Sequence, residues 1–223
     1  MLSYTILLMP AEIYLIGIAG PSGAGKTYLA THLAAAIQAK MLALDRYYHD
    51  LSHLPLEERA RANFDAPEAL DHELLIQQVA RLRNREPVHL PVYDFATHTR
   101  TGKVELMHPT EVVIVEGLFT LHWPGLRELL GTKVYVDMSD EICLTRRQAR
   151  DVRERGRTPE SVVEQFMTTV APMAHRYVRP TVIHADVVVS GAERIEHGVA
   201  RVLAHYRQQI AAASMHNTHH VQK

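Results

Sequence analysis

A run of small residues, Gly20-Pro-Ser-Gly-Ala-Gly-Lys26-Thr27, follows an apolar stretch and precedes residues with helical spacing. It fits G-x-x-x-x-G-K-[ST], in which glycines allow backbone N–H groups to turn inward around a phosphate. The start of the helix adds positive potential, Lys26 can reach phosphate oxygens, and the Thr27 hydroxyl can bind Mg²⁺. The predicted phosphate loop consists of Gly20, Pro21, Ser22, Gly23, Ala24, Gly25, Lys26 and Thr27.

Two carboxylates follow predicted strands. Asp45 comes after the short apolar run 41–44, and Glu116 ends the run VVIVE. Open α/β sheets bind ligands at the carboxyl ends of their strands, so both side chains are expected beside the phosphate loop. A carboxylate there can hold Mg²⁺ through water or accept a proton from a hydroxyl, whereas a purely structural role would be a helix cap or a turn. Two such residues near one phosphate loop favour the chemical role.

Arginines crowd the segment TRRQARDVRERGRTPE, opposed between Arg146 and Arg157 only by Asp151 and Glu154. Gly156 is expected to end the helix that carries them. A solvated helix face is the ordinary explanation of a charge run, and the absence of interleaved aromatic residues disfavours nucleic-acid binding. Near a phosphate loop, guanidinium groups that stabilise phosphoryl charge explain the run better. The predicted lid spans about residues 146–160 and carries Arg146, Arg147, Arg150, Arg153, Arg155 and Arg157.

The elements that must position these groups alternate between strand and helix. Apolar runs at 13–19 and 41–44, and later EVVIVEG, KVYVDM and ADVVVSG, are typical of buried strands, with amphipathic segments such as EALDHELLIQQVARL between them. This alternation predicts an α/β fold with a mostly parallel sheet covered by helices on both faces. The stretch PVHLPVYDFATHTRTGKVELMHP alternates with a period of two and contains a Thr-Gly pair. It predicts an inserted β-hairpin at about residues 87–108, turning at that pair.

Size and charge restrict the class of protein. The 223 residues suit one domain, expected over 1–211, followed by a disordered His-rich tail at 212–223. The 24 basic and 25 acidic side chains nearly cancel, so we expect neither nucleic acid nor a membrane as a partner. Cys143 is the only cysteine, which suits a reducing cytosol. The opening MLSYTILLMP lacks the basic start of a signal peptide, so a cytoplasmic protein is expected.

A phosphate loop alone does not separate a kinase from a GTPase switch or a motor. The sequence has no N-K-x-D motif for reading guanine, and it is short for the modules of a motor. Among these functions of a phosphate loop, phosphoryl transfer to a small molecule is the one that these observations leave. That reaction needs a carboxylate for the metal, a base for the acceptor hydroxyl, and cations for the migrating charge.

With these motifs in place, the sequence resembles the uridine kinase family, also called uridine-cytidine kinase, in the group that includes phosphoribulokinase. The resemblance extends over about residues 13–189 and includes, in the family's order, GIAGPSGAGKT, DRYY, LPLEERARANFDAPEALD, LPVYDFATHTR, VVIVEG and RRQARDVRERGR. It implies a P-loop kinase fold and phosphorylation of the 5′-hydroxyl of uridine and cytidine to UMP and CMP. ATP or GTP with Mg²⁺ would be the donor, and the protein would be a homo-oligomer, a tetramer in the family.

The resemblance also implies roles for single residues. Asp45 matches the catalytic base, while Thr27, Asp45 and Glu116 match the residues linked to magnesium. Asp65 and Arg147 match ribose contacts. The other nucleoside contacts that it implies are Tyr93, Phe95, His98, Arg157 and Gln165. The groups that it places on the donor phosphates during catalysis are Lys26, Arg150, Arg155 and Arg157.

Side-chain chemistry agrees with two of these roles. A carboxylate such as Asp65 can accept hydrogen bonds from both hydroxyls of a diol, so ribose should be preferred strongly over 2′-deoxyribose. Tyr93, Phe95 and His98 could aim their rings at one ligand from the hairpin, although ordinary hairpin packing would also use them. The loop SGAER after ADVVV is one residue shorter than the family's pattern and lacks its arginine. The choice between ATP and GTP therefore stays open.

Two other functions also stay open from the sequence. A sibling kinase could phosphorylate a sugar phosphate or pantothenate, but its acceptor would need an anion site where the hairpin offers aromatic rings. A regulatory module could bind nucleotide without transferring phosphate. That function would leave Asp45 and the arginines unexplained.

Overall fold

A computed structural model of the chain describes residues 12–59 and 61–220, except for the side chains of 155 and 216–220. Five parallel strands form its central sheet, in the order β2-β5-β1-β6-β7. The strands are β1 (Tyr14–Ala19), β2 (Lys40–Ala43), β5 (Val112–Glu116), β6 (Thr132–Asp137) and β7 (Val187–Ser190). The predicted α/β fold with a parallel sheet is confirmed.

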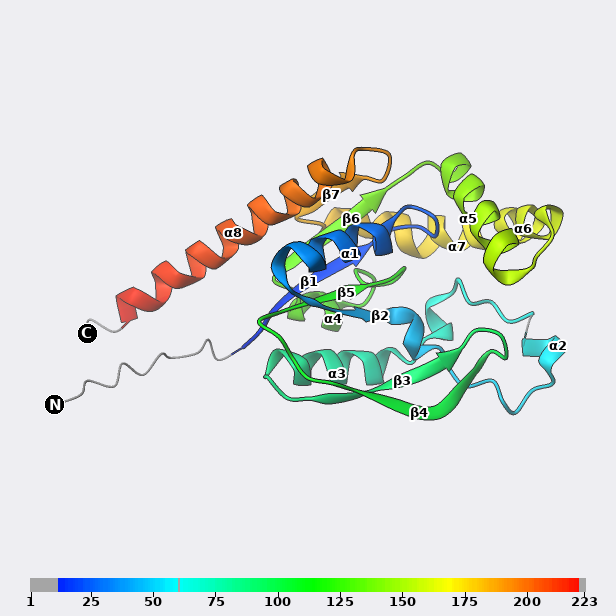
Figure 1. Ribbon diagram of the computed structural model, residues 1–223, viewed down its shortest axis with the longest axis horizontal. Helices are drawn as coiled ribbons and strands as arrows, with labels where there is room; N and C mark the ends of the chain where they lie inside the picture. Colours follow the sequence, from blue (N-terminus) through cyan, green and yellow to red (C-terminus); the bar gives the residue numbers. More distant parts are fainter. Residues whose placement is uncertain (1–11, 60, 221–223) are drawn as a thin grey trace.

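Helices cover both faces of this sheet, as predicted (Figure 1). On one face, α1 (Lys26–Ile37) and α8 (Ile195–His220) form a buried cluster with the sheet. On the other face, α3 (His72–Arg83) and α4 (Pro124–Leu129) form a second cluster. Within β1, Leu15 belongs to the second cluster and its neighbour Ile16 to the first. Burial on both faces explains why the strands read as continuous apolar runs.

The inserted hairpin consists of β3 (Val88–Asp94) and β4 (Thr99–Met107), which pair antiparallel. Its extent agrees with the predicted insertion, but its turn does not lie at the Thr-Gly pair. Gly102 is inside β4, and residues 95–98 form the turn. The Asp94 carboxylate accepts hydrogen bonds from the Ala96 N–H at 2.9 Å and the Thr97 hydroxyl at 2.8 Å. This aspartate turn sets where the chain reverses.

The predicted lid segment, about residues 146–160, lies in α5 (Asp140–Arg155) and the start of α6 (Pro159–Gln165), and these two helices are called the lid below. As predicted, α5 ends at Gly156, whose φ of 62° is left-handed. After α6, the chain continues through η3 (Phe166–Val170), α7 (Ala171–Met173), η4 (Ala174–Val178) and η5 (Arg179–His184). In Figure 1 the lid stands at the same end of the molecule as α2 (Leu56–Arg59) and the hairpin turn.

Three boundaries differ from the sequence predictions. β2 ends at Ala43, so Asp45 lies in the 3-10 turn η1 (Leu44–Tyr47). EALD does not begin the next helix, because Pro67–Ala69 forms the 3-10 turn η2 and the Asp71 side chain caps α3 by accepting from Leu74 N–H at 3.2 Å. α8 continues to His220 through most of the predicted tail, where alanines favour helix.

Two predictions concern residues outside the described part: the role of MLSYTILLMP and the last three residues of the tail. Within the described part, no helix combines the length and apolar character needed to cross a membrane.

Candidate active site

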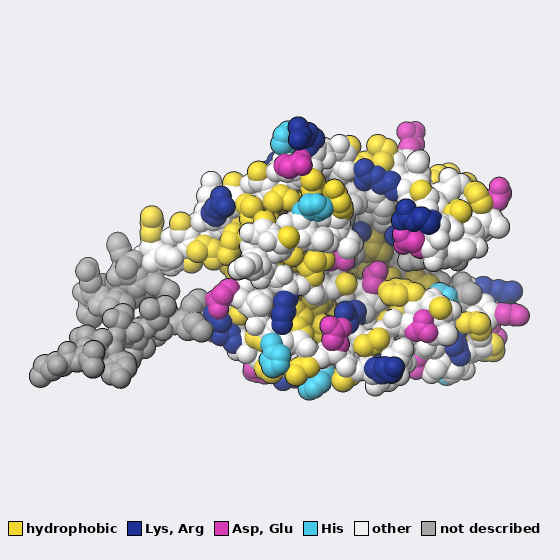
Figure 2. All heavy atoms as spheres, viewed as in Figure 1, with side chains coloured by type: hydrophobic (Ala, Val, Ile, Leu, Met, Phe, Trp, Pro, Cys, Tyr) yellow, Lys and Arg dark blue, Asp and Glu magenta, His cyan; other side chains and the backbone are white. Residues whose placement is uncertain are grey.

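A cavity of about 1250 Å³ opens between the lid and the hairpin. Figure 2 shows the molecule hollowed at this end, with Lys and Arg side chains beside the opening. The cavity gathers most of the predicted site residues from separate parts of the chain. They are Ser22, Gly23, Gly25, Lys26, Thr27, Asp45, Asp65, Tyr93, Phe95, His98, Glu116, Arg147, Arg150, Arg157 and Gln165.

Three predicted residues of the phosphate loop do not line this cavity, and neither does Arg153 of the predicted lid. Gly20, Pro21 and Ala24 belong to the phosphate loop but lie off the cavity wall. The side chain of Arg155 is outside the described part of the chain. Its predicted contact with donor phosphates therefore stays a prediction.

The phosphate loop runs from the end of β1 to the start of α1 and is packed against the lid helix. Gly23 has a φ of 85°, and a Cβ at this position would lie 2.5 Å from the Cys143 carbonyl oxygen in α5. Only glycine fits both conditions. Lys26 donates to the Pro21 carbonyl oxygen at 3.0 Å. Burial lowers the pKa of Lys26, while Glu116 and Asp45 oppose that shift. The loop thus holds a cation where β- and γ-phosphates would bind.

Oxygen ligands meet beside this lysine. The Thr27 hydroxyl donates to the Glu116 carboxylate at 3.2 Å. Glu116 is 7% exposed, and burial raises the pKa of its carboxyl group, with Asp45 adding to the shift and Lys26 opposing it. Asp45 is close enough to affect the pKa of both neighbours. One hydroxyl and two carboxylates are hard oxygen donors of the kind that bind Mg²⁺ next to nucleotide phosphates, so the residues present fit this ion.

Glu116→Gln is expected to gain stability relative to the unmodified protein as pH rises from about 4 to about 7. Because burial raises the pKa of Glu116 above its ordinary value of 4.5, the folded protein binds this proton more tightly than the unfolded chain does. The unmodified protein therefore loses this contribution to folding as pH rises through the folded-state pKa, whereas glutamine does not titrate. Urea unfolding of both proteins at the two pH values measures the effect. A stability difference that does not change with pH would contradict it.

Aromatic rings form the wall opposite the phosphate loop. Phe64 and His98 stack with centroids 4.8 Å apart, and Tyr93 contacts Phe95 edge-on at 5.2 Å. The ring centroids of Tyr48 and Tyr93 are 5.4 Å apart. Tyr93 is 8% exposed, yet its buried hydroxyl has no hydrogen-bond partner among the described residues. Buried hydroxyls are normally paired, so this one indicates a place for a polar ligand atom.

The wall includes two residues to which the sequence analysis gave no role, Tyr48 and Phe64. Both stand next to quoted motif residues, in DRYY and NFD. The only feature of the sequence that could have pointed to Tyr48 and Phe64 is their position beside these motif residues.

A buried ion pair forms part of the wall of the large cavity. Asp65 is 8% exposed and Arg147 is 7% exposed, with 3.9 Å between Arg147 Nη1 and Asp65 Oδ1. Burial raises the pKa of the Asp65 carboxyl group, and Arg147 opposes the shift. Arg147 also donates to the Ser22 hydroxyl at 3.0 Å and to Gln165 Oε1 at 3.1 Å. It therefore links the phosphate loop, the lid and the end of the cavity that holds Asp65.

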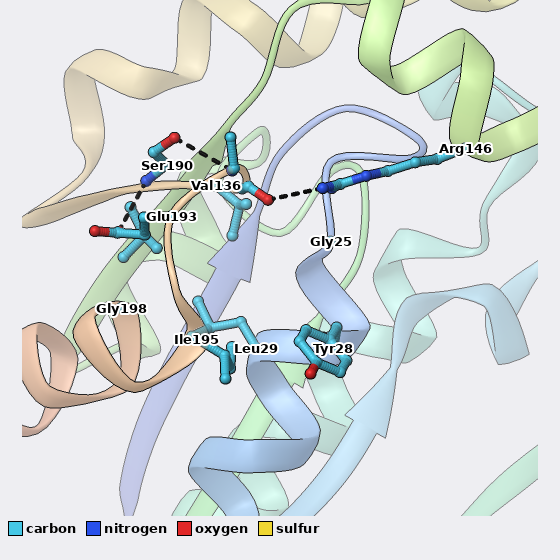
Figure 3. A pocket seen from close by; sticks show the side chains of 12 residues that line it. Gly25, Tyr28, Leu29, Val136, Arg146, Ser190, Glu193, Ile195 and Gly198 are labelled. Atoms are coloured by element: carbon cyan, nitrogen blue, oxygen red, sulfur yellow. Dashed lines mark hydrogen bonds between the residues drawn. The ribbon is translucent and has the colours of Figure 1, made fainter.

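A second, smaller cavity of about 360 Å³ lies on the other side of the phosphate loop. Arg146 lines both cavities, as do Gly25 and Tyr28, and its guanidinium donates to the Gly191 carbonyl at 3.0 Å and to the Ala24 carbonyl at 3.4 Å. Figure 3 shows Arg146 reaching from α5 across the loop, with Tyr28 and Glu193 on the far side of Gly25. Glu193 and Gly191 belong to the loop after β7, which is the segment SGAER that differs from the family's pattern.

Proteins similar in sequence to this chain include uridine kinases from several bacteria. A sequence model of the phosphoribulokinase / uridine kinase family matches residues 15–196, which contain every residue lining the large cavity and all but Gly198 of those lining the smaller one. The uridine kinase of Aliivibrio fischeri (strain MJ11) is 44% identical over 190 residues, covering 81% of this chain and 88% of its own length. The uridine kinase of Anoxybacillus flavithermus is 45% identical over 177 residues, covering 78% and 84%.

Solved structures agree on the fold. The phosphoribulokinase of Rhodobacter spheroides superposes with a TM-score of 0.58 at 14% identity, covering 81% of this chain and 70% of that one. The resemblance first seen in the motifs is confirmed over most of the sequence. Because the family model spans most of the chain and relatives of 44% and 45% identity cover more than three quarters of it, this chain belongs to the phosphoribulokinase / uridine kinase family.

Proposed function

We propose that this protein transfers the γ-phosphoryl group of ATP or GTP to the 5′-hydroxyl of uridine and cytidine, giving UMP and CMP. One observation carries the proposal: a single cavity joins the phosphate loop to a buried Asp65–Arg147 pair and an aromatic wall. A triphosphate site and a site shaped for a neutral nucleoside thus face each other. The relatives described as uridine kinases, at 44% and 45% identity, support this acceptor.

The acceptor half suits a pyrimidine ribonucleoside. Asp65 would accept hydrogen bonds from the ribose 2′- and 3′-hydroxyls, and Arg147 would hold that carboxylate in place. The base would lie against the Phe95 ring, where the Tyr93 hydroxyl and the His98 ring reach its polar edge. A sugar phosphate would place an anion beside Asp65, which a buried carboxylate disfavours.

The donor half suits the triphosphate of a nucleotide. Lys26, Arg150 and Arg157 would stabilise charge on the phosphoryl group as it moves. Thr27, Asp45 and Glu116 would hold Mg²⁺, which neutralises negative charge on the β- and γ-phosphates when bound. Asp45 would take the proton from the 5′-hydroxyl as that oxygen attacks.

The smaller cavity would take the base of the donor. It adjoins the phosphate loop at Gly25 and Tyr28, and Arg146 offers a flat guanidinium on which a purine can stack. Glu193 is held in place, since its carboxylate accepts from the Ser190 N–H at 3.1 Å and from Arg201 at 2.8 Å. This loop would therefore present a fixed surface to the purine.

Gly191→Ala is expected to weaken ATP binding about tenfold, which is about 1.4 kcal/mol. A Cβ at Gly191 would lie 2.0 Å from the Ala24 carbonyl oxygen, so the loop after β7 must move away from the phosphate loop. Calorimetric titration with ATP measures the change. Gly125→Ala is the control, because the nearest atom to its Cβ is the end of the Ile76 side chain at 3.7 Å. Unchanged ATP affinity in Gly191→Ala would contradict the proposed donor site.

A coupled assay of ADP release over a panel of acceptors tests the proposed function. The panel contains uridine, cytidine, adenosine, ribulose 5-phosphate and pantothenate, with Mg²⁺ and ATP or GTP. Turnover is expected with uridine and cytidine, and mass spectrometry should identify UMP and CMP. Turnover with only a sugar phosphate or pantothenate would identify a sibling kinase. ATP binding without transfer to any acceptor would identify a regulatory module.

We further propose that the enzyme acts in the cytoplasm as one domain over residues 1–211 and assembles as a homo-oligomer. The tetramer rests on the family resemblance. Light scattering after size-exclusion chromatography measures this assembly, and a monomer at micromolar concentration would contradict it.

A further inference from the structure

The lid helix α5 contains one fully buried carboxylate, Asp151, at 0% exposure. Its Oδ1 atom accepts from Arg150 Nε at 2.8 Å. Its Oδ2 atom lies 3.5 Å from Arg147 Nε and 3.9 Å from Arg157 Nη1. One negative charge thus stands among three guanidinium groups that all line the large cavity. Asp151 itself lies behind the cavity wall.

The backbone of Asp151 also gathers the lid. Its carbonyl oxygen accepts from the N–H of Gly156, which closes α5, and from the N–H of Arg157 at 3.3 Å. Arg157 is therefore tied to Asp151 through the main chain and through the ion pair. This arrangement turns the chain at Gly156 so that Arg157 points back toward the cavity.

Each arginine beside Asp151 faces a different part of the proposed reaction site. Arg147 is 7% exposed and reaches the Ser22 hydroxyl and Asp65. Arg157 contacts Gln165 Oε1 and donates to the Ser161 carbonyl at 3.0 Å. Arg150, whose Nε donates to Asp151, also lines the large cavity.

Three cations at this spacing repel one another, and a buried carboxylate between them offsets that repulsion. A carboxylate without its cations would be costly to bury, so the four side chains hold each other in one arrangement. We propose that Asp151 is a positioning residue for phosphoryl transfer, holding Arg147, Arg150 and Arg157 in the orientations that meet both substrates. This inference rests on the proposed function.

Asp151→Asn tests the inference because asparagine keeps the size of the side chain and removes its charge. In this variant kcat with uridine is expected to fall about 100-fold, and KM for ATP to rise about tenfold. Glu141→Gln is the matched control, an exposed carboxylate in the first turn of the same helix. Its kinetic constants should equal those of the unmodified protein.

A purely structural role is separated from positioning by a double-mutant cycle. If Asp151 acts through the arginines, Asp151→Asn should cost far less in kcat/KM when Arg150 is already changed to Gln than when it is intact. A structural role predicts that the two effects multiply. It also predicts that the folded fraction of Asp151→Asn keeps the original kcat per active site and the original KM. Either result would overturn the inference.

Calorimetric ATP binding keeps this test separate from that of the proposed function. If the unmodified protein phosphorylates uridine and Asp151→Asn matches it, the inference fails while the function stands. If the unmodified protein phosphorylates no acceptor, the function fails, and weaker ATP binding by Asp151→Asn still supports the positioning of Arg150 and Arg157. Equal ATP affinity would then reject the positioning as well.

Discussion

Asp45→Asn should lower kcat for uridine phosphorylation by about three orders of magnitude, with little change in uridine affinity. Asparagine has the same shape as aspartate but cannot take a proton from the 5′-hydroxyl. The side chain projects from the turn after β2 into the large cavity, beside Lys26 and Glu116. It lies on the phosphate side, so the aromatic wall and Asp65 that would bind the nucleoside stay intact.

Steady-state rates from the coupled assay give kcat, and calorimetry with uridine gives the affinity. Glu57→Gln, an exposed carboxylate on α2, serves as the control and should keep full activity. A kcat within tenfold of the unmodified protein would mean that another group or solvent takes the proton. A large loss of uridine affinity would mean instead that Asp45 helps to build the acceptor site.

The phosphate loop and the strands could be predicted because their signals are local. The loop needs glycines at fixed spacing before a helix, and Gly23 shows why: its left-handed φ and the nearby Cys143 carbonyl admit no side chain. The buried strands are continuous apolar runs because both faces of the sheet are covered. Gly156, likewise, ends the arginine-rich helix by its own conformation.

The acceptor half of the site could not be derived in this way. Asp65, Tyr93 and Arg147 are brought together by the packing of the hairpin and the lid against the sheet, which no local pattern specifies. Their predicted roles came from family resemblance. Tyr48 and Phe64 received none, because a single aromatic residue in a loop has the same pattern whether it packs in a core or lines a cavity.

Two sequence predictions were wrong where a side-chain hydrogen bond determines the backbone conformation. The Asp94 carboxylate makes the hairpin turn at 95–98, although the Thr-Gly pair a few residues later has the better composition for one. The Asp71 cap moves the start of α3 past residues that have good helical spacing. In both cases a hydrogen bond that an aspartate carboxylate accepts outweighs the intrinsic preference of the neighbouring residues.

The largest selectivity is expected at the ribose: kcat/KM for 2′-deoxyuridine should be about a thousandfold below that for uridine. Asp65 is a buried carboxylate whose pKa burial already raises, so its ionised form needs hydrogen-bond donors. The ribose diol supplies two, whereas 2′-deoxyribose leaves one acceptor position buried and unpaired. The discrimination therefore comes from the penalty on the wrong substrate as much as from affinity for the right one.

Asp65→Ala separates this explanation from a general loss of fit. Without the carboxylate nothing is left unpaired by a missing 2′-hydroxyl, so kcat/KM for uridine should fall steeply while that for 2′-deoxyuridine changes little. The two substrates should then differ by about tenfold or less. The ratio of uridine to cytidine should stay unchanged, because in the proposed complex the base would contact Tyr93 and His98 rather than Asp65. If uridine and 2′-deoxyuridine lose activity in equal proportion, Asp65 shapes the cavity without reading the sugar, and the ribose contact must lie elsewhere.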